Sequence, residues 1–282
     1  MENIRQAVER AKARSDLRNA SGLSSLPQRP TFPQRPIQDL SDARQEVELN
    51  PKHLQSQRIV AFDGKDSRSR AFDILRAEVL RTMDLSGWKT IGVTSPTPGC
   101  GKTVTATNLA LSMARQPERD ICLVDLDLQR PQVANALGLR RRDGALDVIE
   151  GRVGLGSATS IVRVGGSRLE VLPTTPSLDS SDVVASAPMK TFLQELGGHG
   201  QARIVVLDLP PILTSHDVIT VLPQLDCILF VVSVGVSKVS DIEECDKYLE
   251  AANVLRIVLN KAPLSKTAYA YNYYAEHGMA KR

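Results

Sequence analysis

Residues 95–103 read SPTPGCGKT and form the most informative stretch of this chain. The residues before them, IGVTS at 91–95, are typical of a short buried strand, and TVTATNLALSMAR at 103–115 carries apolar side chains at helical spacing. The stretch therefore connects the end of a strand to the start of a helix. Backbone N–H groups at the positive end of a helix dipole bind phosphate oxygens. We expect a nucleoside triphosphate as the ligand.

The loop supplies several groups suited to phosphate. Successive N–H groups around Gly99, Cys100 and Gly101 are placed to converge on phosphate oxygens, and glycine lets the backbone approach closely. Lys102 is expected to reach the β- and γ-phosphates, and Thr103 to bind Mg²⁺. The residues expected to contact the nucleotide are Pro98, Gly99, Cys100, Gly101, Lys102, Thr103 and Val104.

One position departs from the usual phosphate-binding pattern, G-x-x-x-x-G-K-[ST], because Pro96 stands where the first glycine is expected. The loop by itself therefore leaves open an ordinary strand-to-helix turn. Two further apolar runs end in carboxylates: ICLVDLDLQRP contains Asp125 and Asp127, and RIVVLDLPP contains Asp208. A single aspartate after a strand is commonly a helix cap. Three of them at the carboxyl ends of parallel strands, together with a lysine and a threonine, indicate a site.

The remaining pattern predicts an α/β fold with a doubly wound, mostly parallel sheet. Further strands are expected within 169–176, 227–235 and 255–263, and helices at 68–83, from 144 onward and at 241–252. Together with the loop this describes a P-loop NTPase with deviant Walker motifs. The core is expected to begin near Ile59.

The chain divides into three regions by composition. Residues 1–58 hold a charged amphipathic helix at 2–19 and a Pro-rich flexible linker that repeats P-Q-R-P, residues 59–264 form the P-loop domain, and residues 265–282 form a tyrosine-rich tail. The first helix is either a solvated charged helix or a docking element for a partner.

Overall composition bounds the class of protein. With 282 residues, 42% hydrophobic and 24% charged, the chain is expected to be globular, and a net charge of +3 does not indicate a nucleic-acid partner. No apolar stretch approaches the roughly 18 residues of a membrane span. The cysteines form no C-x-x-C pair, which is typical of a reduced cytoplasmic protein; they are Cys100, Cys122, Cys227 and Cys245. Cys100 is interpreted as a packed residue, with a reactive thiol as the alternative.

The combination resembles the bacterial tyrosine autokinases of polysaccharide synthesis and export, from residue 68 to the end of the chain. SPTPGCGKT is similar to the family's first nucleotide motif, which usually has glutamate in place of Cys100, while DLDLQRP and LDLPP are similar to the second and third. GALDVIEGRVGLGSAT resembles the segment that follows the second motif. The resemblance implies that the phosphoacceptors are Tyr269, Tyr271, Tyr273 and Tyr274.

The resemblance also implies roles for the site residues, with ATP and Mg²⁺ as cofactors. Lys102 would neutralise phosphate charge, while Thr103, Asp127 and Asp208 would hold Mg²⁺ directly or through water. Asp125 and Asp127 would organise the metal's water shell and the incoming tyrosine, and one of the two, with Asp125 preferred, would accept the phenolic proton. Asn260 matches the position at which relatives contact the adenine ring. The catalytic set is therefore Lys102, Asp125, Asp127 and Asp208.

Partners follow from the same resemblance. It implies a transmembrane chain-length determinant, a polysaccharide co-polymerase, that activates the kinase and holds it, as a cytoplasmic protein, at the inner face of the plasma membrane. It also implies a homo-oligomer, with a ring as one form. The family's ring-forming pattern E-x-x-R-x-x-R falls on Arg70, Asp73 and Arg76, of which only Arg76 agrees. The changed charges either preserve a salt-bridged contact with a different partner or indicate another assembly.

Three other functions are considered. A partition or septum-positioning ATPase would carry an early second lysine in the loop, as in K-G-G, where this chain has Ser95, Pro96 and Thr97. An iron–sulfur carrier ATPase would need a C-x-x-C pair. A nucleotide-binding regulatory scaffold with weak catalysis remains open, because the altered helix charges and the short tyrosine cluster are compatible with it.

Overall fold

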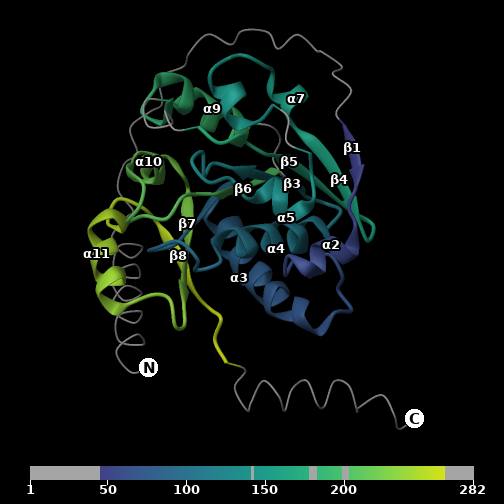
Figure 1. Cartoon of the computed structure of the whole chain (residues 1–282), viewed down its shortest axis with the longest axis horizontal. Helices are drawn as coiled ribbons and strands as arrows, with labels where there is room; N and C mark the ends of the chain where they lie inside the picture. The colour runs from purple at the N-terminus through teal and green to yellow at the C-terminus, as the bar shows by residue number, and fades with distance from the viewer. Residues whose placement is uncertain (1–44, 141–142, 178–182, 199–202, 264–282) are drawn as a thin grey trace.

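The computed structural model describes residues 45–140, 143–177, 183–198 and 203–263. The predictions for the N-terminal helix, the linker and the tyrosine tail lie outside these ranges. The described chain forms one sheet of eight strands (Figure 1). Across the sheet their order is β1 (Glu46–Glu48), β4 (Ser160–Val164), β5 (Ser167–Leu172), β3 (Asp120–Asp125), β6 (Arg203–Asp208), β2 (Thr90–Thr94), β7 (Cys227–Ser233) and β8 (Val254–Asn260).

Helices cover both faces of the sheet, so its central strands are apolar throughout. One face packs on α2 (Pro51–Ser56), α3 (Arg70–Ser86), α4 (Lys102–Ala114) and α5 (Val133–Leu137). The other packs on α6 (Ala145–Ile149), α7 (Leu155–Ala158), α9 (Ala187–Gly198), α10 (His216–Val221) and α11 (Val239–Leu249). Short 3₁₀ turns lie at Ser67–Ser69 and Leu222–Gln224. None of the helices in the described ranges is both long and apolar enough to cross a bilayer.

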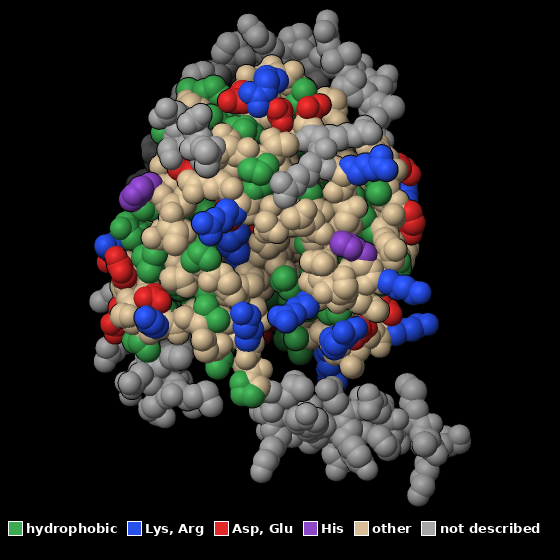
Figure 2. All heavy atoms as spheres, viewed as in Figure 1, with side chains coloured by type: hydrophobic (Ala, Val, Ile, Leu, Met, Phe, Trp, Pro, Cys, Tyr) green, Lys and Arg blue, Asp and Glu red, His purple; other side chains and the backbone are tan. Residues whose placement is uncertain are grey.

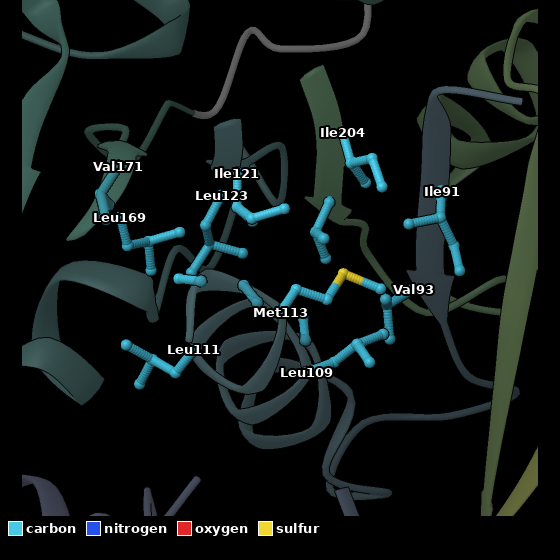
Figure 3. Close-up of a cluster of buried hydrophobic side chains, with 14 of the residues drawn as sticks. Ile91, Val93, Leu109, Leu111, Met113, Ile121, Leu123, Leu169, Val171 and Ile204 are labelled. Carbon is cyan, nitrogen blue, oxygen red and sulfur yellow. The ribbon is translucent and has the colours of Figure 1, made fainter. Parts of the chain in front are cut away.

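Successive residues of each central strand point to opposite faces and therefore enter separate cores. On β3, Ile121 and Leu123 join the core under α4, whereas Cys122 and Val124 join the core under α9. Figure 3 shows the first of these cores, with side chains of α4 such as Leu109 and Met113 directed toward the strands. Only the β4–β5 pair is antiparallel among the described strand pairs. The predicted doubly wound, mostly parallel sheet is confirmed.

The core begins earlier than the sequence predicts. Glu46 of β1 pairs with Ile161 of β4, and Leu49 and Leu54 are buried. The start expected near Ile59 is therefore wrong, and residues 45–58 pack on the domain instead of belonging to a linker. A three-residue strand of sequence EVE has no hydrophobic alternation long enough to recognise, and its partner strand lies more than a hundred residues away.

Helices α3 and α4 are joined by a polar cluster around Asp73. Its Oδ1 accepts hydrogen bonds from Ser112 Oγ at 2.7 Å and Arg115 Nη1 at 2.8 Å, and it lies 3.3 Å from Arg76 Nη1. Arg76 Nη1 also donates to the Ser112 carbonyl at 2.8 Å. Asp73 and Arg76, which align with the ring-forming pattern, thus make contacts inside the chain. Ring assembly itself stays a prediction.

We expect Asp73→Ala to lower the free energy of unfolding by about 2 kcal/mol, because it leaves two partly buried arginines without their shared carboxylate. Asp84→Ala on the same helix is the matched control. Asp84 pairs with Arg119 while 52% exposed, and an exposed pair contributes about 1 kcal/mol or less. Urea unfolding of both variants measures the difference. Equal losses of unfolding free energy in the two variants would show that Asp73 contributes no more to stability than an exposed ion-pair residue.

Candidate nucleotide site

The order of the central strands brings the predicted site residues together. Strands β3, β6 and β2 are neighbours, and in their register Asp125 pairs with Asp208, which also pairs with Val93 just before the loop. Because all three strands are parallel, their carboxyl ends lie at one edge of the sheet. The loop at 95–103, Asp127 and Asp208 consequently meet there, as the sequence predicts.

The phosphate loop has the backbone that its glycines permit. Gly99 has a φ of 81° and Gly101 a φ of 93°, and α4 begins at the next residue, Lys102. Both angles lie in the left-handed region that side chains disfavour. Helix α4 therefore begins at the carboxyl edge of the sheet, and the first N–H groups of a helix are where an anion would bind.

The end of β8 supports this loop. Asn260 Nδ2 donates to the Cys100 carbonyl at 2.9 Å, and Lys261 Nζ donates to the Gly99 carbonyl at 2.8 Å. A Cβ atom on Gly101 would lie 2.2 Å from Asn260 Nδ2. Asn260 therefore stabilises the backbone of the loop and is not among the described residues that line the cavity. The contact with adenine predicted for it stays a prediction.

Charged side chains converge in front of the loop. Lys102 Nζ lies 2.8 Å from Asp127 Oδ2 and 3.3 Å from Asp208 Oδ1, and Thr103 Oγ1 donates to Asp208 Oδ2 at 2.6 Å. Burial alone would lower the pKa of Lys102, but the charges of Asp208 and Asp127 outweigh it and raise that pKa. Lys102 is therefore a firmly charged ammonium group beside the position of a bound phosphate.

Asp125 lies deeper than Asp127. It is fully buried, and its two oxygens accept from the backbone N–H groups of Asp127 at 3.2 Å and Val133 at 2.9 Å. Burial, with a further contribution from the charge of Asp208, raises the pKa of Asp125 to about 8. Asp125 is held as a support for the turn that carries Asp127.

The raised pKa of Asp125 predicts a pH dependence of stability in the protein without nucleotide or Mg²⁺. Between an unfolded pKa near 4 and a folded pKa of about 8, the folded state holds a proton that the unfolded state has lost, so stability falls as pH rises through this window. Burial also raises the pKa of Asp208, which acts in the same direction. Asp125→Asn should flatten the fall in melting temperature between about pH 6 and pH 8.5, whereas Asp120→Asn, at the exposed start of β3, should not. Parallel curves for wild type and Asp125→Asn would contradict this.

A cavity of about 480 Å³ opens at this edge of the sheet. It lies within the range of small-molecule sites. From the predicted set, the cavity is lined by Pro98, Gly99, Gly101, Lys102, Thr103, Val104 and Asp127. Sequence reasoning missed the other lining residues, which are Arg58, Gln129, Arg130, Gln132, Pro210, Pro211, Thr214, Ser215 and Lys261. Gln129, Arg130 and the two prolines follow the carboxylate motifs directly, and this adjacency is a signal that could have found them.

Four predicted residues are absent from the described lining: Cys100, Asp125, Asp208 and Asn260. The Cys100 side chain is buried, with its Sγ 3.3 Å from Ser237 Oγ. This favours the packed residue over the reactive thiol. Asp208 still touches the lining residues Lys102 and Thr103.

The donor atoms suit a small hard cation. Thr103 Oγ1 and Asp208 Oδ2 are 2.6 Å apart at the first turn of α4. Mg²⁺ is usually bound through one or two carboxylates together with phosphate oxygens and water. The residues present therefore fit Mg²⁺ bound together with a nucleotide.

The model of the CobQ/CobB/MinD/ParA nucleotide-binding domain matches residues 91–277. The chain belongs to this family. The curated relatives of this CobQ/CobB/MinD/ParA domain include proteins named as tyrosine-protein kinases or putative tyrosine-protein kinases. EpsB of Ralstonia nicotianae is 28% identical over 205 residues, which are 72% of this chain and 27% of EpsB. Tyrosine-protein kinase YwqD of Bacillus subtilis is 26% identical over 224 residues, which are 78% of this chain and 92% of YwqD.

The CobQ/CobB/MinD/ParA domain also resembles solved structures. The crystal structure of the chimerical protein CapA2B2 aligns with a TM-score of 0.65 at 23% identity, covering 78% of this chain and 93% of that one. This likeness shows the fold. The relatives' names confirm the resemblance to bacterial tyrosine kinases that the motifs predict. The chain spans about a quarter of the length of the first curated relatives it matches.

Proposed function

We propose that the chain is an ATP-dependent protein-tyrosine kinase that phosphorylates its own tail cluster at Tyr269, Tyr271, Tyr273 and Tyr274. The observation that carries this proposal is the arrangement of Lys102, Thr103, Asp127 and Asp208 around one phosphate loop. Phosphoryl transfer depends on positioning and charge stabilisation, which this arrangement supplies. Relatives named as tyrosine-protein kinases support tyrosine as the acceptor.

The backbone and side chains of the site have different roles in phosphoryl transfer. Backbone N–H groups of the loop position the β- and γ-phosphates, and Lys102 offsets their charge. Thr103 and Asp208 would hold Mg²⁺ directly or through water, and Asp127 would contact its water shell. When bound, Mg²⁺ supplies positive charge that stabilises the transferring phosphoryl group.

The acceptor's proton requires a carboxylate that faces the substrate. As a tyrosine Oη forms its bond to the γ-phosphorus, the bond to the ADP oxygen breaks and the phenolic proton passes to a base. The resemblance implies one of Asp125 and Asp127 for this role, with Asp125 preferred. We assign it to Asp127, because Asp127 lines the cavity whereas Asp125 is fully buried and is not among the described lining residues.

The cellular setting belongs to the proposal as well. A transmembrane chain-length determinant would activate the kinase and keep it, as a cytoplasmic protein, at the inner face of the plasma membrane, where phosphorylation would regulate polysaccharide polymerisation and export. A homo-oligomer would let the tail of one subunit enter the site of its neighbour. Each added phosphate carries about −1.5 to −2 charges, which would loosen such an assembly. The motif resemblance supports these statements.

Incubation of the purified chain with Mg²⁺ and ATP, followed by mass-spectrometric mapping of phosphotyrosine, tests the activity. We expect label on the tail cluster and its loss when all four tyrosines are changed to phenylalanine. Nucleotide binding without label, even with the cytoplasmic segment of the membrane partner present, would reject the autokinase and favour the regulatory scaffold. Label on added proteins but not on the tail would redirect the proposal to other substrates.

A further inference from the structure

Two arginines line the cavity without a side-chain partner among the residues that the structure describes. Arg58 follows α2, and Arg130 lies in the turn between β3 and α5. Both residues are exposed, and neither guanidinium makes a hydrogen bond or ion pair within the described ranges. The third exposed cation of the lining, Lys261, differs because its Nζ is bonded to the Gly99 carbonyl. Figure 2 shows Lys and Arg side chains (blue) around a hollow near the middle of this face.

The backbone of Arg58 is held in an unusual conformation. Its φ is 62°, a left-handed value that costs a residue with a side chain about 1–2 kcal/mol. Asn108 of α4 fixes it: Nδ2 donates to the Arg58 carbonyl at 3.0 Å, and Oδ1 accepts from Val60 N at 2.8 Å and Ala61 N at 3.0 Å. Glycine would adopt this φ without strain. What arginine adds at this position is its guanidinium, carried by a backbone that is held relative to the helix that starts at the phosphate loop.

Arg130 is tied to the carboxylate that we assign as proton acceptor. Its backbone N–H donates to Asp127 Oδ1 at 3.0 Å, while Asp127 Oδ2 lies 2.8 Å from Lys102 Nζ. The same turn therefore carries the proposed base and a guanidinium that makes no hydrogen bond or ion pair with the described residues. An acceptor hydroxyl that reaches Asp127 must bring the rest of its chain close to Arg130.

We propose that Arg58 and Arg130 bind a phosphate group on the acceptor polypeptide, so that a segment already carrying one phosphotyrosine is the preferred substrate for the next transfer. This rests on the proposed function and names its substrate class. The donor nucleotide has its own ligands in the loop N–H groups and Lys102. Guanidinium groups bind phosphate through paired, charge-assisted hydrogen bonds, for which lysine is a poorer match.

The spacing of the tail tyrosines agrees with this assignment. Tyr269, Tyr271 and Tyr273 alternate in the sequence. In a peptide bound in extended form, side chains two residues apart point the same way and are about 7 Å from one another. A phosphate on one tyrosine would therefore lie beside the next one that enters the site, on the side of the two arginines. The tail would be modified in succession once its first tyrosine is phosphorylated.

Binding of synthetic peptides tests this without requiring turnover. The probes are residues 265–282, either unmodified or phosphorylated at Tyr271, titrated by fluorescence anisotropy against the full chain. The protein carries phenylalanine at its four tail tyrosines, so that its own tail does not compete, and Mg²⁺ with a non-hydrolysable ATP analogue is present. We expect the phosphopeptide to bind about tenfold more tightly than the unmodified peptide, the gain of one good charged contact.

The variants Arg58→Gln and Arg130→Gln should each reduce this preference, and their combination should remove it. Arg58→Gly removes the side chain and relieves the backbone strain, so it should reduce the preference as Arg58→Gln does. Arg81 is an exposed arginine of α3 outside the cavity, and Arg81→Gln is the charge-matched control that should keep the preference. Equal binding of the two peptides to wild type, or a preference that survives the double change, would overturn the proposal.

Two further measurements test whether the arginines bind the donor nucleotide or a nucleic acid instead of a phosphorylated polypeptide. A fluorescent ATP analogue should bind the double variant as it binds wild type; an affinity loss of about tenfold would assign the arginines to the donor nucleotide and overturn the proposal. Competition by a single-stranded oligonucleotide as strong as that of the phosphopeptide would overturn the choice of a polypeptide. Because every readout is binding, failure of the kinase activity is detected separately by the phosphotyrosine mapping described above.

Discussion

We expect Lys102→Met to lower tyrosine phosphorylation about a thousandfold, because it removes a charged group that stabilises the transferring phosphoryl group. Lys102 also supplies the positive charge between Asp127 and Asp208, at 2.8 and 3.3 Å. Without it, the two carboxylates face the incoming phosphates unopposed, so nucleotide affinity falls as well. Phosphotyrosine formation and binding of a fluorescent ATP analogue measure the two effects.

Lys65→Met is the control for this change, because Lys65 is exposed and lies outside the cavity. It should retain wild-type activity. The melting temperature of each variant shows whether the fold is kept. If Lys102→Met keeps more than about a tenth of the activity, the lysine does not act on the transferred group and the proposed division of roles is wrong.

Gly101→Ala should weaken nucleotide binding about a hundredfold, because two costs combine. Alanine would have to adopt a φ of 93°, and its Cβ would lie 2.2 Å from Asn260 Nδ2. Moving Asn260 aside gives up its hydrogen bond to the Cys100 carbonyl. Titration with the ATP analogue gives the affinity.

Gly156→Ala is the matched control, since a Cβ there meets nothing within 4 Å and the residue lies within α7. The double variant Gly101→Ala, Asn260→Ala removes the collision but leaves the backbone strain, so it should recover part of the affinity. Full recovery would assign the whole effect to the collision, and an unchanged affinity in Gly101→Ala would show that the loop conformation does not govern binding.

The sequence predicts those parts of the site that lie in short contiguous motifs. The phosphate loop, Asp127 and Asp208 are found because each follows an apolar strand whose pattern is local. Arg58 could not be found in this way, because its place in the cavity depends on Asn108 and on a segment that precedes the first recognisable strand. The different positions of Asp125 and Asp127 are likewise set by backbone contacts with Val133 and Asp127 N, which a D-x-D pattern does not reveal.

Some elements of the fold were missed although a signal was present. Gly165 and Gly166 have positive φ values and join β4 to β5, and a Gly-Gly pair between two apolar runs is typical of a tight hairpin. Helix α9 buries Met189, Phe192 and Leu196 at helical spacing. In contrast, β1 is a polar triplet whose strand character depends on pairing with β4. Of these three elements, β1 is the one that the local sequence pattern could not predict.

The supports from β8 make the last described strand and the nucleotide thermodynamically linked. Among the described strands β8 pairs with β7 alone and lies at the edge of the sheet, and Asn260 and Lys261 at its end donate hydrogen bonds to the carbonyls of Cys100 and Gly99. A ligand that stabilises the loop must therefore also stabilise the pairing of β8 with the sheet. By reciprocity, a force or partner that detaches β8 lowers the binding affinity for the ligand by the same factor. The strand that connects the nucleotide site to the tyrosines in the sequence is thus also an element through which nucleotide affinity can be changed.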